Sequence, residues 1–159
     1  MHARKDAELR AVLGRSATIL AEASGPDGLA LVGTADRLAA RVDDEWRVFG
    51  WHEIERGAWR AQSGRMRWVD VEGRPTEVVV DEPGRLPMLF QERVQASTLV
   101  TVHLDVEPGE VRIVARRALD GSDDVRFYAA PSGGASLDSE PVRALVVAET
   151  ERIRAEYGL

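Results

Sequence analysis

Short apolar runs separated by turn residues recur along the chain and alternate with polar residues in places, which is the pattern of β-strands. Residues 17–23 read ATILAEA and residues 29–34 read LALVGT, with a loop rich in glycine and proline between them. This pattern predicts two strands joined as a hairpin. Asp36 to Val42 continues as a third strand, and the acidic pair Asp43-Asp44 makes the next turn. The first part of the chain is therefore predicted to form antiparallel sheet.

All four tryptophans of the chain lie in one short run that ends at residue 70. Polar residues separate them, so the run is interpreted as a pair of strands that packs on a core. We expect Trp51 and Trp59 to be core residues. For Trp46 and Trp68 the sequence leaves two interpretations open, a place in the core or a role as anchors for a partner, because tryptophan is enriched at binding hot spots.

The rest of the pattern predicts helices at both ends of the chain and one between two groups of strands. Pro87 suits the start of a helix because its missing N–H would be unpaired there anyway. The predicted segments are a lead-in helix (1–14), a first group of antiparallel strands (17–80), an inserted helix (86–98), a second strand group (99–129) and a C-terminal helix (139–157).

Together these segments predict a single α+β domain over residues 1–159. Its expected architecture is an antiparallel split β-barrel or strongly bent sheet capped by a C-terminal helix, with a short N-terminal helix and one inserted helix. An all-parallel sheet would require crossover helices, which the pattern lacks. The expected architecture resembles the pleckstrin-homology-like, GRAM-like fold.

Several short segments resemble an uncharacterised family of actinobacterial proteins of similar length. They are Trp51-His52-Glu53-Ile54, Ala58-Trp59, Asp81 to Pro87, Glu92 to Ser97, Val111 to Arg117 and Glu140 to Ala144. The resemblance covers most of the chain. It implies an actinobacterial source and a cytoplasmic location, and it implies no activity.

The charge and apolar content exclude several classes of function. With 21 basic and 27 acidic residues, the chain has no basic stripe that would neutralise the phosphates of a DNA duplex. No apolar run approaches the roughly 20 residues that span a bilayer, and the segment from Met1 to Arg10 lacks the core of a signal peptide. The absence of cysteine excludes disulfides and thiolate zinc sites. We expect a cytoplasmic protein that binds neither nucleic acid nor membrane.

Histidines and carboxylates supply the candidate chemistry. His52 stands beside Glu53, and His103 lies two residues before Asp105, on the same face of a predicted strand. Where two such strands meet, these four groups would form an acid-base pair or a metal site. Their spacing matches no helical ligand set, so strand residues that face solvent are the simpler explanation. We therefore predict no catalytic residue, no metal and no cofactor.

Other motifs are incomplete. The run Asp120 to Asp124 resembles the start of a calcium-binding loop, but Val125 stands at the glycine position and Pro131 at the glutamate position, so an acidic turn is predicted. The chain has no nucleophile elbow, Walker loop or dinucleotide fingerprint. The first hairpin loop carries Asp27 and no basic residue, which argues against binding of lipid headgroups.

Two classes of function stay open. The first is a non-catalytic module that binds an unidentified protein or peptide, with Trp46 and Trp68 as candidate anchors. The alternative is a small-molecule-binding protein or enzyme that uses the cluster of His52, Glu53, His103 and Asp105. A homodimer formed through an exposed strand is compatible with both. The incomplete catalytic motifs favour the interaction module.

Overall fold

The computed structural model describes the backbone of residues 2–159 and the side chains of residues 6–159, so Met1 of the predicted lead-in helix lies outside it. Within these residues, three antiparallel sheets and three α-helices form an α+β structure, which confirms the predicted class, and none of the sheets closes into a barrel. The chain divides into a first unit, Met1–Ser97 with Ala118–Ser122, and a second unit, Thr98–Arg117 with Asp123–Leu159. The assignment of all 159 residues to one domain stays a prediction.

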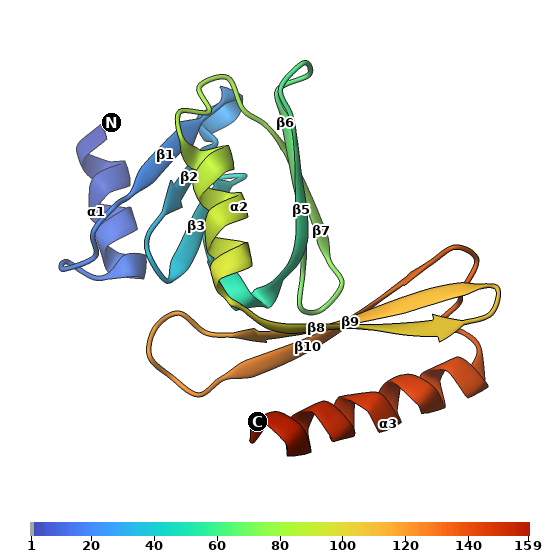
Figure 1. Ribbon diagram of the computed structural model, residues 1–159. Helices are drawn as coiled ribbons and strands as arrows, with labels where there is room; N and C mark the ends of the chain where they lie inside the picture. The colour runs from blue at the N-terminus through green and yellow to red at the C-terminus, as the bar shows by residue number, and fades with distance from the viewer. Residues whose placement is uncertain (1) are drawn as a thin grey trace. The chain divides into compact units, whose positions relative to one another are not determined.

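The first unit begins with α1 (His2–Leu13) and a four-stranded antiparallel sheet in the order β1-β2-β3-β4 (Figure 1). The strands are β1 (Ala21–Ser24), β2 (Ala30–Gly33), β3 (Arg37–Val42) and β4 (Glu45–Gly50), with a 3-10 turn at Pro26–Gly28. On one face of this sheet, Leu9 and Leu13 of α1 pack against Val32 and Ala39. Because strand residues alternate between faces, the residues adjacent to Val32 and Ala39, which are Leu31, Leu38 and Ala40, point into the main core.

A second antiparallel sheet and a helix complete the first unit (Figure 1). A 3-10 turn at Trp51–Glu53 leads into β5 (Ile54–Arg60), β6 (Arg65–Asp70) and β7 (Pro75–Val79), which pair in that order, and α2 (Leu86–Ala96) follows. Pro87 lies in the first turn of α2, where the sequence predicts the start of the inserted helix. The helix contacts strands of both sheets.

Aromatic rings fill the core that α2 shares with the two sheets. The indole of Trp51 is fully buried, meets the ring of Phe90 edge-on at 5.6 Å between centroids, and donates a hydrogen bond from Nε1 to the carbonyl oxygen of Thr34 at 2.9 Å. Trp68 is also buried and packs edge-on against Phe49 at 5.9 Å. Edge-on ring pairs add stability beyond the area that they bury. The expected core position of Trp51 is confirmed.

The second unit consists of a three-stranded antiparallel sheet and a long helix (Figure 1). Its elements are β8 (Thr98–Val106), β9 (Gly109–Arg117), β10 (Val125–Ser132) and α3 (Glu140–Tyr157), and the strand order is β10-β9-β8. Val142 and Ile153 of α3 pack on Val111 and Ile113 of β9. None of the helices that the structure describes is long and apolar enough to cross a membrane.

Replacing Ile153 with alanine tests the packing of α3. Ile153 is fully buried, so Ile153→Ala should lower the free energy of unfolding by about 2–5 kcal/mol through lost burial and a cavity. Chemical denaturation followed by circular dichroism measures this loss. Leu145 lies on the same helix with 53% of its surface exposed, so Leu145→Ala is the control and should change stability little. Equal losses in the two variants would contradict the described packing.

Candidate functional site

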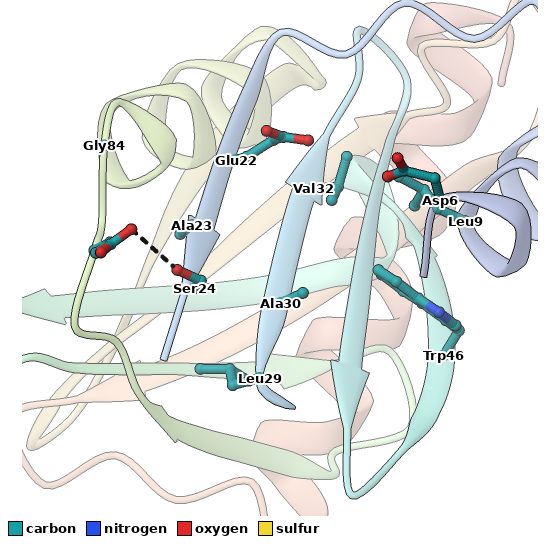
Figure 2. Close-up of a pocket in the computed structure, with 11 residues that line it drawn as sticks. Asp6, Leu9, Glu22, Ala23, Ser24, Leu29, Ala30, Val32, Trp46 and Gly84 are labelled. Atoms are coloured by element: carbon teal, nitrogen blue, oxygen red, sulfur yellow. Dashed lines mark hydrogen bonds between the residues drawn. The ribbon is translucent and has the colours of Figure 1, made fainter. Parts of the chain in front are cut away.

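The first unit has a groove on the face of the first sheet that α1 covers in part (Figure 2). The strand register places two rows of side chains on this face. Read from β1 to β4, the rows are Ser24, Ala30, Arg41 and Trp46, and then Glu22, Val32, Ala39 and Val48. Helix α1 packs over Val32 and Ala39. A groove of about 400 Å³ lies beside the helix.

The groove has an apolar lining. Leu29, Ala30 and Val32 contribute from the first sheet and the turn that precedes β2. Figure 2 shows Leu9 of α1 and Trp46 of β4 on the same side of the groove, near Val32. Pockets that bind small groups have volumes of roughly 300–1,000 Å³ and similar linings. The groove therefore has room for a few side chains.

Trp46 is held in place by a polar network. Its Nε1 donates a hydrogen bond to Oε2 of Glu8 at 3.2 Å, and the same carboxylate lies 3.5 Å from Nε of Arg41. Arg41 also pairs with Asp44 at 3.0 Å and donates to the carbonyl oxygen of Gly28 at 3.2 Å. Arg41 thus pairs with two carboxylates, and one of them also accepts the indole hydrogen bond at the edge of the groove. Trp46 is partly exposed.

Three carboxylates surround the apolar lining. Asp6 comes from α1, Glu22 from β1 and Glu82 from the segment that follows β7. None of the basic side chains that the structure describes forms an ion pair with these three residues. The Oγ of Ser24 lies 3.5 Å from Oε2 of Glu82 (dashed in Figure 2). The groove is therefore apolar at its base and negatively charged around it.

The segment that carries Glu82 closes the outer edge of β1. Ser24 and Glu82 exchange two backbone hydrogen bonds of 3.0 Å, from each N–H to the other carbonyl oxygen. Two residues later, Gly84 has a φ of +52°, and a Cβ there would lie 2.9 Å from the carbonyl oxygen of Glu22. This close approach and the left-handed backbone both require glycine. The segment thus forms one wall of the groove.

The structure places the predicted histidine cluster in two different units. In the first unit, Oε1 of Glu53 accepts a hydrogen bond from the backbone N–H of Gly50 at 2.9 Å, and His52 is buried above that glycine. In the second unit, Nδ1 of the exposed His103 lies 3.3 Å from Oε1 of Glu110. Asp105 shares the exposed face of β8 with His103.

The four-residue cluster therefore stays a prediction. Among the residues that the structure describes, no group of three or more His, Asp or Glu residues has an arrangement that would hold a metal ion. Glu53 acts instead as a cap for the 3-10 turn that joins the two sheets of the first unit.

The two candidate tryptophans lie in different places, Trp68 in the main core and Trp46 packed against the cluster under α1. Trp68 is 1% exposed and lies in the core, where it offers a partner no surface. Trp46 lines the groove. Trp59, expected in the core, is only partly buried and lines a second groove of about 740 Å³ between α2 and β5, next to Met88. Of the predicted anchors, Trp46 alone lies in the candidate site.

The three carboxylates that line the groove were not predicted from the sequence. Glu22 is the charged residue in the predicted strand ATILAEA, so the pattern could have placed it on the face opposite the core. Glu82 and Asp6 follow no such pattern, because they reach the groove through the pairing of a loop with β1 and the packing of α1.

The acidic segment Asp120 to Asp124 lies in the connection between β9 and β10. The backbone N–H of Ser122 donates to Oδ1 of Asp120 at 2.9 Å. Hydrogen bonds from the side chain and the backbone of Ser122 lower the pKa of the exposed Asp120 carboxyl, and the nearby His52 adds to this effect. The segment is a hydrogen-bonded turn that stabilises the ionised aspartate.

Comparisons of the chain with protein-family models, with curated proteins and with solved structures give no match. The antiparallel α+β architecture is therefore shown by the structure alone. The resemblance to an actinobacterial family and to the pleckstrin-homology-like fold stays a prediction.

Replacing Gly84 with alanine tests the wall of the groove. Gly84→Ala should lower the free energy of unfolding by ~1 kcal/mol or more, because alanine is strained at this φ and its Cβ meets the Glu22 carbonyl. Gly73 has a φ of +78°, but a Cβ there would meet no atom within 4 Å, so Gly73→Ala is the matched control for strain alone. A smaller loss for Gly84→Ala than for Gly73→Ala in denaturant titrations would contradict the contact.

Replacing Ser122 with alanine tests the turn. In Ser122→Ala the pKa of Asp120 should rise toward the ordinary aspartate value of about 3.9, because a hydrogen bond to the carboxylate is lost. The lowered pKa in the native chain stabilises the fold above the unfolded pKa, and this contribution is lost as the pH falls through the folded value. Titration of the carboxyl carbon by NMR measures the shift. Ser63→Ala serves as control, since the hydroxyl of Ser63 donates to the carbonyl oxygen of Arg60 and not to Asp120. An unchanged Asp120 pKa in Ser122→Ala would refute the hydrogen bond between Ser122 and Asp120.

Proposed function

We propose that the chain is a non-catalytic interaction module that binds a segment of a partner protein in the groove beside α1. The observation that carries the proposal is the position of Trp46, which is partly exposed and lines a groove of about 400 Å³ together with Leu9 and Val32. Tryptophan is enriched among binding hot spots, which lie in well-packed pockets.

The rigidity of Trp46 supports the proposal. Its indole N–H donates a hydrogen bond to Glu8, which Arg41 also contacts, and these contacts favour the observed orientation of the side chain. Binding to a pre-organised side chain costs less conformational entropy than binding to a mobile one. A groove of this size contacts a few side chains and supports weak, reversible recognition of a short segment better than a permanent assembly.

The arrangement of the first unit supports a finer assignment of the fold. Its two antiparallel sheets are followed by α2, which packs on strands of both. This is the order of a split barrel closed by a helix, as in the pleckstrin-homology-like, GRAM-like fold. In the proposed assignment α2 takes the capping role and α3 belongs to the second unit. A cytoplasmic location and an actinobacterial source are part of the same proposal.

Replacing single tryptophans tests the function. Peptides selected from a random display library on the intact chain should bind Trp46→Ala at least about thirtyfold more weakly, which is the loss of a hot spot. Circular dichroism checks that the variant is folded. Trp59→Ala is the matched control, because Trp59 is a second partly exposed tryptophan and lines a different groove.

The opposite pattern, with binding lost in Trp59→Ala and kept in Trp46→Ala, would place the site elsewhere.

Trp68→Ala separates a core role of Trp68 from a binding role. Because Trp68 is buried, this variant should lose about 3–5 kcal/mol of stability rather than affinity alone.

A further inference from the structure

We propose that the segment bound beside α1 is positively charged and places an arginine or lysine side chain among Asp6, Glu22 and Glu82. This inference rests on the proposed function and names the chemistry of the partner. The three carboxylates come from separate elements and line one groove. A bound cation would gain the attraction of these carboxylates, which have no cationic partner among the described residues.

No described basic side chain of the first unit takes the place proposed for the arginine or lysine of the partner. Arg41 is the basic residue nearest to the groove in the strand register, and it is already paired with Glu8 and Asp44. The described basic side chains form no ion pair with the three groove carboxylates. The whole chain has a formal net charge of −6, which also attracts cationic segments over distance.

The apolar lining selects a side chain rather than a free metal ion. Leu29, Ala30 and Val32 offer a surface for methylene groups, while the carboxylates lie around it. Arginine and lysine have this mixed character, because an apolar stem carries a charged head. The indole of Trp46 adds a favourable surface for a guanidinium or ammonium group. A protein segment also supplies the apolar neighbours that fill the rest of the groove.

The segment is recognised by its side chains and not by strand addition to β1. Strand addition requires a free edge of backbone N–H and C=O groups. At Ser24 both groups are bonded to Glu82, and Gly84 lies against the carbonyl oxygen of Glu22. The edge of β1 next to the groove is therefore occupied by the chain itself, and charge and apolar contact must supply the specificity.

The test selects peptides from a random display library on the intact chain and measures the affinity of the best synthetic peptide by calorimetry. The selected peptides should be enriched in arginine or lysine beside apolar residues. Replacing the basic residue of the peptide by glutamine should weaken binding about tenfold. The double variant Glu22→Gln/Glu82→Gln of the protein should bind the unchanged peptide about tenfold more weakly as well. Affinity should also fall as salt is added.

Glu45→Gln is the matched control. Glu45 is an exposed glutamate of β4, in the same sheet, and does not line the groove, so this variant should bind with unchanged affinity. A loss equal to that of the double variant would show a general effect of net charge and overturn the proposed site. Spermidine, a cation without apolar side chains, should compete weakly; competition as strong as that of the peptide would overturn the assignment to a protein segment.

The remaining outcomes separate the two proposals. Peptides that depend on Trp46 but show no basic preference would overturn the charge assignment and leave the interaction module in place. A library that yields no binder would overturn the interaction module itself. Selection of acidic peptides would overturn the charge assignment directly.

Discussion

The first unit depends on the close approach of α2 to the backbone of two sheets. Gly33 on β2 and Gly57 on β5 make this approach possible. A Cβ at Gly33 would lie 2.5 Å from Cδ2 of Leu89, and a Cβ at Gly57 would lie 2.3 Å from Cε1 of Phe90. Leu89 and Phe90 are both buried. Because any larger residue at either glycine would displace the buried side chain of Leu89 or Phe90, these glycines allow α2 to pack its side chains directly on the backbone of both sheets.

The same packing determines which face of the first sheet carries the groove. Once α2 and the aromatic residues occupy the inner face of the first sheet, the outer face is left to α1. That helix has 12 residues, and its buried Leu9 and Leu13 pack on Val32 and Ala39. The part of the sheet nearest β1 is not covered by these contacts. The groove is therefore a consequence of a short helix on a four-stranded sheet.

Local pattern in the sequence predicts most of the strands and helices, because alternation and turn residues act over a few positions. Pro87 and Ser139 mark helix starts within one residue of those in the structure. The division of the strands into three sheets was not predicted, since it depends on long-range pairing. The groove beside α1 was not predicted, although one of its residues was a candidate. Trp46 stood out by residue type, whereas Asp6 and Glu82 reach it through contacts between segments far apart in the chain.

The two units of the chain carry different aromatic residues, which gives each its own optical signal. All four tryptophans lie in the first unit, and both tyrosines, Tyr128 and Tyr157, lie in the second. Tryptophan fluorescence of the unmodified protein therefore monitors the first unit alone, and tyrosine absorbance changes monitor the second. The chain contains built-in probes that separate the folding of its two parts without any label.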